Sequence, residues 1–409
     1  MRDNKLLVRI VGTGMDGDLT LTQAARSAIA ESDAVFGAER LTKPFSMLEK
    51  PVFNTWNAAE IAEIIRREGF RHPCVLVSGD CGFFSAAKSL EEKLGGFETE
   101  LICGISTPVY FSSKIKIPWQ DMKFISLHSK GNSVARHVCR NKYCFFLLGG
   151  DISAKRVCGE LFGYGLGDIK VRIGEDLGYP TEKISVGTAR EFAENVNIRF
   201  EKLCVMVTEN PGYERGSSTG IPDDEFIREN DHEIPMTKAE VRAVVMSKLG
   251  VGDGDICWDI GCGTGSVTVE MALSCGSGSV YAVDVSDTAA GLTGVNCRKF
   301  RCDNAFVYQG KAPDILENFS EEFPAPDCVF IGGSGGNLGE ILEFVFRHAK
   351  SGARVVVTAV TLNTLERCRS VFSELGVEAE IVQAAFARVG AGSMVKALNP
   401  IFIIKGIVP

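Results

Sequence analysis

Three glycines at alternate positions follow a short apolar run of the sequence: Gly261, Gly263 and Gly265. The run itself carries one acid, Asp259. Because glycine has no Cβ, such a loop lets the backbone lie against a flat ligand, and a helix that starts directly after it points free N–H groups at the ligand. Residues 267–276 have helical apolar spacing and end at a glycine, which predicts that helix. The order is therefore strand, ligand-binding turn, helix.

A second acid, Asp284, closes the next predicted strand, residues 279–285. An acid at this point of a strand–turn–helix–strand unit can accept both hydroxyls of an adenosine ribose. The loop has the spacing G-x-G-x-G rather than G-x-G-x-x-G, which disfavours a dinucleotide with its pyrophosphate and favours S-adenosylmethionine. The alternative, a tight turn that binds nothing, stays open.

A similar glycine loop, residues 11–18, follows the first apolar run of the chain. Further apolar runs recur, most of them ending in Gly, Ser or Asp, and the intervening residues 24–32 and 58–69 have helical spacing. Strands that alternate with helices predict an α/β fold with largely parallel, buried sheets. The apolar runs are residues 6–11, 74–80, 143–150, 203–208, 255–260, 279–285, 327–333 and 353–360.

The clearest domain boundary is residues 210–226, where Gly, Pro, Ser and acids cluster and no apolar period survives. We predict one domain over residues 1–208, a linker over 209–224 and a second domain over 225–409. Both domains have an ordinary size for an independently folded unit.

The composition excludes several classes of protein. With 45% hydrophobic and 23% charged residues, the chain is typical of a globular protein. The net charge is −8, and residues 209–409 carry 17 Lys and Arg against 27 Asp and Glu, which argues against nucleic acid as a partner. No stretch of about 18 uncharged apolar residues predicts a membrane span.

The 14 cysteines do not predict a metal site or a disulfide framework. No pair has C-x-x-C spacing, and the closest pairs are five residues apart. We expect buried free thiols, no bound metal and a cytoplasmic location.

The basic N-terminal start leads into a strand and a glycine turn, so we do not interpret it as a signal peptide.

Five segments of the second half resemble the C-terminal methyltransferases of the cobalamin pathway, which methylate a precorrin at carbon 15 and remove the carboxyl group of an acetate chain. These segments are residues 234–243, 259–270, 280–284, 310–316 and 330–342. The resemblance implies a Rossmann-like fold that binds S-adenosylmethionine. The residues that it implies for the donor are Thr237, Gly261, Cys262, Gly263, Thr264, Gly265, Asp284 and Ala312.

The first half is similar to the tetrapyrrole methyltransferases, a two-lobed fold that also uses S-adenosylmethionine. The match runs through residues 11–41, 76–90, 104–121, 126–131 and 174–192. It implies donor contacts at Gly12, Gly14, Ser78, Gly79, Asp80, Ser106, Thr107, Leu148 and Gly187. Side by side, the halves resemble the fused precorrin-6Y C5,15-methyltransferases (decarboxylating), with two donor sites per chain. The implied reaction converts precorrin-6B, or its cobalt form, to precorrin-8.

Two residues depart from the pattern of these families. Cys81 stands where the first family usually has proline after Ser-Gly-Asp, so the turn after Asp80 is less constrained. Lys311 stands where the second family often has an acid, which puts the contact to adenine in doubt.

A sulfonium methyl donor needs no enzyme nucleophile, so we assign no catalytic residue. The lone His128 near the first cleft is more simply interpreted as structural.

A precorrin bears many carboxylates, which predicts cations at the cleft of an acidic domain. Candidates, as a group, are Lys238, Arg242, Lys311 and Arg388. We expect Gly332, Gly333, Ser334, Gly335 and Gly336 to let the flat ring approach the backbone. We also expect a homo-oligomer.

Two other functions remain open. The segment Asn-Pro-Gly-Tyr, residues 210–213, is similar to the motif that holds a base amino group in nucleic-acid N-methyltransferases, although it lacks the second proline. Alternatively, one half is a non-catalytic scaffold that only binds the cofactor, as the departures at Cys81 and Lys311 suggest.

Overall fold

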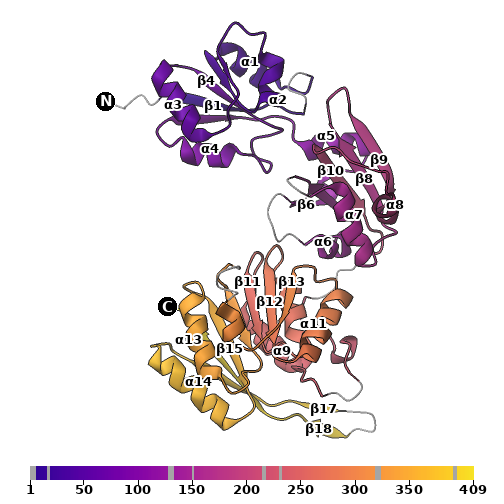
Figure 1. Cartoon of the computed structure of the whole chain (residues 1–409), viewed down its shortest axis with the longest axis vertical. Helices are drawn as coiled ribbons and strands as arrows, with labels where there is room; N and C mark the ends of the chain where they lie inside the picture. The colour runs from indigo at the N-terminus through magenta and orange to yellow at the C-terminus, as the bar shows by residue number, and fades with distance from the viewer. Residues whose placement is uncertain are drawn as a thin grey trace. The chain divides into compact units, whose positions relative to one another are not determined.

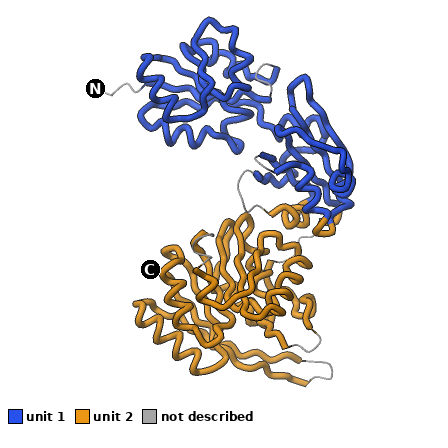
Figure 2. Tube along the Cα trace, viewed as in Figure 1, with its two compact units in different colours: residues 1–128, 142–162, 166–211 blue, residues 129–141, 163–165, 212–409 orange. Residues whose placement is uncertain are grey.

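The structure, a computed structural model, divides the chain into two compact units (Figure 2). Unit 1 comprises residues 1–128, 142–162 and 166–211, and unit 2 comprises residues 129–141, 163–165 and 212–409. The structure describes residues 6–15, 19–127, 133–149, 152–213, 218–229, 233–317, 324–389 and 394–409.

The first sheet of unit 1 is fully parallel, in the order β3-β2-β4-β1-β5. Figure 1 labels two of its strands, β1 and β4. Its strands are β1 (Leu7–Gly12), β2 (Ala34–Phe36), β3 (Val52–Phe53), β4 (Pro73–Val77) and β5 (Glu98–Ile102). Its helices are α1 (Gln23–Glu31), α2 (Glu39–Thr42), α3 (Ala58–Glu68) and α4 (Ala87–Lys93), with a 3-10 turn η1 (Lys43–Phe45). α1 and α2 pack on the face that carries Val11, and α3 and α4 on the face that carries Ile10.

Side-chain caps fix where the helices of this sheet begin. The Thr22 hydroxyl accepts a hydrogen bond from the N–H of Ala25 at the start of α1, and the Asn57 side chain accepts from Ala59 at the start of α3. α3 ends at Gly69 in the left-handed conformation, φ 72°. These caps confirm the predicted helices at residues 24–32 and 58–69.

The second sheet of unit 1 has the order β6-β7-β10-β8-β9 and is mostly antiparallel. Its strands are β6 (Met122–Ser126), β7 (Tyr143–Leu147), β8 (Lys170–Glu175), β9 (Lys183–Thr188) and β10 (Cys204–Glu209). Around it lie α5 (Thr107–Ile115), η2 (Trp119–Asp121), α7 (Ala154–Gly163) and α8 (Ala189–Glu194). The expectation of largely parallel sheets is wrong here, because a short loop joins β8 to β9 and such a connection permits only antiparallel pairing.

Unit 2 is built on a seven-stranded sheet in the order β13-β12-β11-β14-β15-β19-β16. Its strands are β11 (Ile256–Ile260), β12 (Ser279–Asp284), β13 (Ala305–Gln309), β14 (Cys328–Ile331), β15 (Arg354–Ala359), β16 (Glu380–Ala384) and β19 (Ile401–Ile407), and a hairpin pairs β17 (Ala387–Val389) with β18 (Val395–Ala397). Its helices are α6 (Ala135–Arg140), α9 (Ala239–Leu249), α10 (Ser266–Ser274), α11 (Asp287–Lys299), α13 (Leu338–His348) and α14 (Leu362–Glu374), with η3 (Asp223–Glu225). β19 runs antiparallel to both of its neighbours, and the other pairs are parallel.

The central strand β11 is buried on both faces. Trp258 and Ile260 pack against α13 and α14, whereas Cys257 packs against α9 and α10. The chain continues from β11 to β12 and β13 on one side, then returns to β14 on the other, so the strand order reverses at the carboxyl end of β11. Ligands of open α/β sheets bind at such a reversal.

Two segments outside the main sheet complete unit 2. Ile221 and Phe226, which flank η3, lie in the core beneath α9 and α10. α6 is joined to residues that follow α10 and α11: Asp303 accepts hydrogen bonds from the N–H groups of Val134 and Ala135, and Arg136 donates to the carbonyl of Gly276 at 2.7 Å. Both segments thus contribute to the packing of unit 2.

Among the residues that the structure describes, no helix has the length and apolar character needed to cross a membrane.

Candidate functional site

The glycine loop of unit 2 adopts backbone conformations that other residues rarely take. Gly261, Gly263 and Gly265 have φ values of 76°, 56° and 77°. α10 starts directly after them at Ser266, as the sequence predicts. The loop therefore turns the chain from the end of β11 into a helix whose first N–H groups face the carboxyl edge of the sheet.

Each of these glycines is in close contact with a different segment. A Cβ on Gly261 would lie 2.5 Å from the backbone N of Gly333, and one on Gly263 would lie 2.6 Å from the carbonyl of Pro235. A Cβ on Gly265 would lie 2.8 Å from the side chain of Thr293 in α11. The spacing G-x-G-x-G is thus required by packing on three sides of the loop.

Asp284 fixes the loop from the neighbouring strand. Its Oδ2 accepts a hydrogen bond from the N–H of Gly263 at 2.9 Å, and its Oδ1 accepts from the N–H of Ser286 at 3.0 Å. Each carboxylate oxygen keeps a second lone pair for a ligand. The acid at the end of β12 therefore lies where it can both hold the loop and accept hydroxyl groups.

Asp259 lies beneath the loop and is fully buried. Its Oδ2 accepts a hydrogen bond from the Thr268 hydroxyl, while its Oδ1 has no hydrogen-bond partner among the described residues. Burial raises the pKa of Asp259 to about 7. A buried carboxylate oxygen without a hydrogen-bond partner is costly, which favours the neutral form of this carboxyl group.

The glycine loop and Asp284, but not Asp259, line a cavity of about 300 Å³ at the carboxyl end of β11, called here the unit 2 cavity. Of the residues expected to bind the donor, Thr237, Gly261, Cys262, Gly263, Asp284 and Ala312 line it. Of those expected to bind the substrate, Lys311, Gly332, Gly333, Ser334 and Gly335 line it. Thr264, Gly265 and Gly336 do not: Thr264 is fully buried, its N–H donates to the carbonyl of Pro235, and its carbonyl accepts from the side chain of Asn296.

A second hollow of about 470 Å³, the side cavity, adjoins the unit 2 cavity and shares Pro235, Thr237, Gly332, Gly333 and Ser334 with it. Its walls are largely apolar, and one cation, Lys238, lies among the residues that line it. Burial lowers the pKa of Lys238. A flat apolar ligand with an acidic group would fit these walls beside a molecule in the unit 2 cavity.

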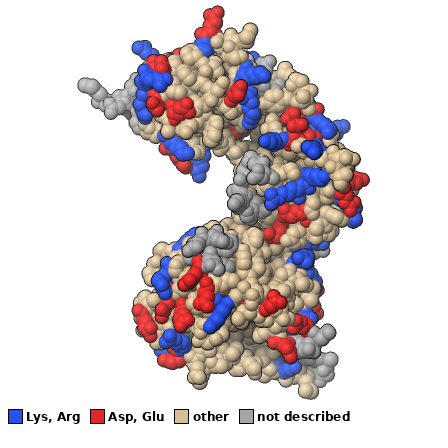
Figure 3. All heavy atoms as spheres, in the orientation of Figure 1, with Lys and Arg blue, Asp and Glu red and all other residues tan. Residues whose placement is uncertain are grey.

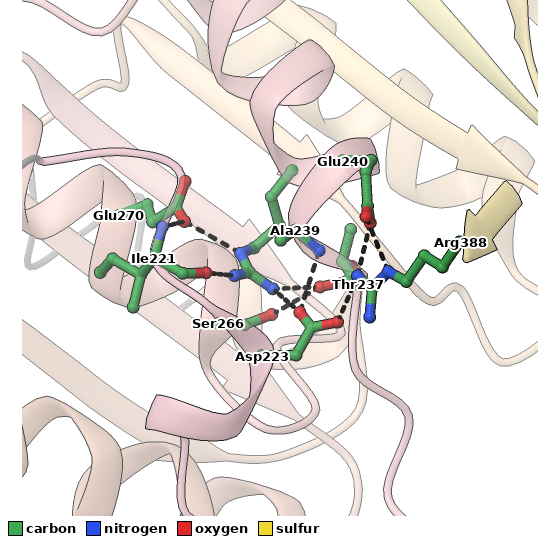
Figure 4. Close-up of polar contacts among 9 residues, drawn as sticks. Ile221, Asp223, Thr237, Ala239, Glu240, Ser266, Glu270 and Arg388 are labelled. Carbon is green, nitrogen blue, oxygen red and sulfur yellow. Dashed lines mark hydrogen bonds and ion pairs between the residues drawn. The ribbon is translucent and has the colours of Figure 1, made fainter. Parts of the chain in front are cut away.

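Arg242, which we expected at the substrate, is a structural residue instead. Its side chain is fully buried, and its guanidinium donates to Glu270 and Asp223 at 3.0 Å each (Figure 4). It also donates to the carbonyls of Thr237 and Ile221. The structure therefore does not bring Arg242 into either cavity, although through Thr237 it holds a segment that lines both.

Arg388 is also engaged elsewhere. From β17 it donates to Glu240 at 2.6 Å and to Asp223 at 2.8 Å (Figure 4). The two carboxylates raise the pKa of Arg388, and the hydrogen bond from Arg388 lowers the pKa of Glu240 to about 2. An arginine shared by two acids is not available to a substrate, and Arg388 lines neither cavity.

In unit 1, three loops converge at the carboxyl edge of the parallel sheet. Gly14 and Gly79 exchange backbone hydrogen bonds at 3.1 and 2.9 Å. A Cβ on Gly104 would lie 2.1 Å from the carbonyl of Gly79, and one on Gly12 would lie 2.7 Å from the same atom. The glycines therefore allow the loops after β1, β4 and β5 to touch one another.

Asp80 ties these loops together, and Cys81 faces away from them. The carboxylate of Asp80 accepts from the N–H of Gly104 at 3.0 Å and from that of Gly82 at 2.8 Å. The Cys81 thiol donates toward the carbonyls of Ile10 and Ile102, and burial raises the pKa of Cys81 to about 11. The residue that replaces proline thus anchors the turn to the ends of β1 and β5.

The loops open onto a cavity of about 260 Å³, the unit 1 cavity. Among the expected donor residues, Ser78, Gly79, Asp80, Thr107 and Leu148 line it. Gly12, Gly14, Ser106 and Gly187 do not; Gly187 lies on β9, where a Cβ would meet Glu191 and Phe192 of α8. His128 lies outside the described residues.

Several residues of this cavity were not expected from the sequence, among them Arg40, Phe83, Phe84 and Lys202. The two phenylalanines directly follow Asp-Cys-Gly in a matched segment, so the sequence did carry a signal for them. Arg40 and Lys202 come from segments about 160 residues apart in the chain, and only the fold brings them to one cavity.

Comparison with known proteins agrees with this geometry. Family profiles for a precorrin methyltransferase domain and for tetrapyrrole (corrin/porphyrin) methylases match residues 229–405 and 8–193. The probable cobalt-precorrin-6B C(15)-methyltransferase (decarboxylating) of Saccharolobus solfataricus is 42% identical over 193 residues, which cover 46% of this chain and 94% of that protein. The chain belongs to the decarboxylating precorrin methyltransferases.

Similarity to this family extends over both halves. The precorrin-6Y C(5,15)-methyltransferase [decarboxylating] of a Sinorhizobium species is 28% identical over 356 residues, 86% of this chain and 84% of that protein. A crystal structure of precorrin-6Y C5,15-methyltransferase from Geobacter metallireducens GS-15 is 35% identical, with a TM-score of 0.44, and covers 47% of this chain and 100% of that chain. The predicted family, fold class and decarboxylating methyltransferase activity are confirmed.

Proposed function

We propose that this precorrin methyltransferase methylates precorrin-6B, or its cobalt form, at carbons 5 and 15 and removes the carboxyl group of the carbon 12 acetate, giving precorrin-8 for cobalamin biosynthesis. The observation that carries the proposal is a pair of glycine-lined cavities, one in each unit. Unit 1 would serve carbon 5 and unit 2 would serve carbon 15, each with its own S-adenosylmethionine.

In unit 2, the residues present fit an adenosyl donor. Asp284 would accept the ribose hydroxyls, and the backbone at Gly261 and Gly263 would lie against the ligand, where any side chain would collide with Gly333 or Pro235. When bound, S-adenosylmethionine supplies an electrophilic methyl group on a sulfonium.

In unit 1, the loops after β4 and β5 would hold the donor. Ser78 and Gly79 present their backbone to the cavity, and Thr107 presents the start of α5. Asp80 keeps the loops in register through its hydrogen bonds to Gly82 and Gly104. Gly12 and Gly14 would contribute indirectly, because their small size lets the loops after β1, β4 and β5 touch one another. Neither glycine would touch the ligand.

The side cavity of unit 2 suits the tetrapyrrole. Gly332, Gly333 and Gly335 leave an exposed backbone edge against which a flat ring can lie. Lys238 and Lys311 are the two cations of the proposed set that line these cavities, and they would pair with carboxylates at the edge of the ring. The proposed substrate set therefore leaves out Arg242 and Arg388.

The protein's part in decarboxylation would be to hold the acetate away from water. The bond between the carboxylate and its methylene carbon breaks, its electron pair passes to a protonated imine of the macrocycle, and carbon dioxide leaves. Leu338, Val357 and Leu398 give the side cavity apolar walls, and excluding water from a carboxylate favours its loss. No side chain of the chain is needed as a nucleophile.

One assay tests this proposal. The full chain is incubated with precorrin-6B and labelled S-adenosylmethionine, and mass spectrometry counts the methyl groups gained and the carboxyl lost. We expect two gains and one loss. Gly79→Val, in the unit 1 cavity, should leave only the carbon 15 methyl and the decarboxylation, and Gly261→Val should leave only the carbon 5 methyl. A wild-type chain that adds a single methyl group would show that one unit is a silent scaffold and refute the proposal.

The nucleic-acid alternative finds no support in the geometry. Asn210 of the Asn-Pro-Gly-Tyr segment is 7% exposed, and it lines neither the unit 1 cavity nor the unit 2 cavity. On the visible face of each unit, Lys and Arg are interspersed with Asp and Glu (Figure 3).

We propose a cytoplasmic location, which the free state of all 14 cysteines supports. A homo-oligomer stays a prediction.

A further inference from the structure

The unit 1 cavity contains three exposed side chains that the donor does not require. Arg40 belongs to α2, Phe84 follows the loop after β4, and Lys202 precedes β10. Arg40 and Lys202 make no ion pair or hydrogen bond with another residue in the part of the chain that the structure describes. Two unpartnered cations at one cavity favour an anionic ligand.

The backbone around Lys202 is held in place although its side chain is free. The N–H of Glu201 donates to Glu175 at 3.0 Å, and the carbonyl of Leu203 accepts from the N–H of Asp176 at 3.0 Å. Both neighbours of Lys202 are therefore fixed to the end of β8, which sets the point of the backbone from which this charged side chain extends at the cavity.

Phe84 has an unusual backbone for a bulky residue. Its φ is 43°, in the left-handed region, and the residue is 54% exposed. Phe83 beside it packs edge-on against Phe124 and Phe145 in the core, which anchors the turn, and the rings of Phe83 and Phe84 meet at 4.8 Å and 74°. A strained, exposed aromatic residue at a cavity indicates that its position serves binding rather than folding.

We propose that Arg40, Lys202 and Phe84 bind the tetrapyrrole for methylation at carbon 5: the two cations pair with peripheral carboxylates of the ring, and the phenyl ring of Phe84 lies against the face of the macrocycle. This inference rests on the proposed function of unit 1. It assigns the specificity of that unit to charges supplied by both of its sheets, since Arg40 follows β2 and Lys202 precedes β10.

The test uses the full chain and the same precorrin-6B assay, with the KM for tetrapyrrole measured separately for the carbon 5 and carbon 15 methylations. Arg40→Gln and Lys202→Gln should each raise the carbon 5 KM about 3- to 10-fold, and the double charge reversal Arg40→Glu with Lys202→Glu at least about 30-fold. The carbon 15 KM and the Kd for S-adenosylmethionine should not change. Lys88→Gln removes an exposed charge of unit 1 that does not line the cavity, and should leave all three values unchanged.

Phe84→Gly separates a binding role from a structural one. Glycine adopts the left-handed conformation without strain, so the variant should unfold at the same or a higher temperature while the carbon 5 KM rises about 5-fold or more. Trp56→Leu, which truncates an exposed aromatic side chain away from the cavity, is the matched control.

Distinct outcomes overturn the inference and the proposed function. If the wild-type chain adds no methyl at carbon 5, the proposed function of unit 1 fails. If it does, and the three substitutions leave the carbon 5 KM unchanged or raise the Kd of S-adenosylmethionine instead, these residues do not bind the tetrapyrrole and the inference fails.

Discussion

Nε of Arg242 donates a hydrogen bond to Oε1 of Glu270 at 3.0 Å, and neither side chain is exposed to solvent. The pair joins α9 to α10, the helix that begins at the glycine loop. The same guanidinium reaches Asp223 and the carbonyl of Thr237 (Figure 4). A buried charge with partners on three segments thus supports the wall of the unit 2 cavity without entering it.

Removing Arg242 should destabilise unit 2 severely. Arg242→Met leaves the buried Glu270 carboxylate without its cation, and we expect a loss of about 3–5 kcal/mol in the free energy of unfolding, measured by urea denaturation. Arg298→Met removes an exposed arginine from α11 and should change it by less than about 0.5 kcal/mol. The double variant Arg242→Met with Glu270→Leu should recover much of the loss, because no buried carboxylate remains at that position. Equal stability of the two single variants would contradict this role.

Two effects of a side chain at Gly261 can be measured separately: the collision with Gly333 and the strain of the left-handed backbone conformation. Gly261→Ala places a Cβ 2.5 Å from the backbone of Gly333, whereas Gly352→Ala, at φ 81°, meets nothing within 4 Å. Both variants carry strain of roughly 1 kcal/mol, but only the first displaces the wall of the cavity. We expect Gly261→Ala to lower the rate of carbon 15 methylation at least about 100-fold, with Gly352→Ala close to wild type in that assay.

Asp284 should determine the affinity of unit 2 for the donor. Asp284→Ala removes the acceptor for the N–H of Gly263 and the proposed acceptor for the ribose, and should weaken binding of S-adenosylhomocysteine to unit 2 by about 10- to 100-fold. Asp284→Asn keeps one carbonyl oxygen and should lose less. In isothermal titration calorimetry of the full chain, Asp284→Ala should show one strong site per chain, where we propose two for the wild type. Two unaltered sites in Asp284→Ala would disprove the assignment.

Asp259 should make the stability of unit 2 depend on pH. Burial raises its pKa to about 7 from the 3.8 of an exposed carboxyl, so between these values the unfolded chain has released a proton that the folded chain still holds. The contribution of Asp259 to stability is therefore most favourable below about pH 4 and falls as the pH rises to about 7, by at most about 1.4 kcal/mol per pH unit.

Asp259→Asn tests this dependence, since it removes the titrating group and keeps an acceptor for the Thr268 hydroxyl. Its stability relative to wild type, measured by urea denaturation from pH 5 to pH 8, should increase toward pH 7 and then level off. Asp287→Asn, at an exposed position in the first turn of α11, should show no such trend. A pH-independent difference for Asp259→Asn would mean that the carboxylate is ionised throughout.

Local pattern was sufficient for much of the fold. The eight apolar runs correspond to β1, β4, β7, β10, β11, β12, β14 and β15, because a strand buried on both faces must be apolar along its length. The helix after Gly265 was predictable from its spacing, and it ends within two residues of Gly276. Strand direction in the second sheet of unit 1 was not predictable, since periodicity reports burial and carries no information on which neighbour a strand pairs with.

The sequence by itself determined the two glycine loops, the acids Asp259 and Asp284 and the family, because each is a short-range pattern of residue types. Only the tertiary structure decided which charges are available to a ligand: Arg242 and Arg388 are occupied by Glu270, Asp223 and Glu240, whereas Lys238 and Lys311 line cavities. The physical reason is that a cation's role depends on the carboxylates within about 4 Å of it, and those come from distant parts of the chain.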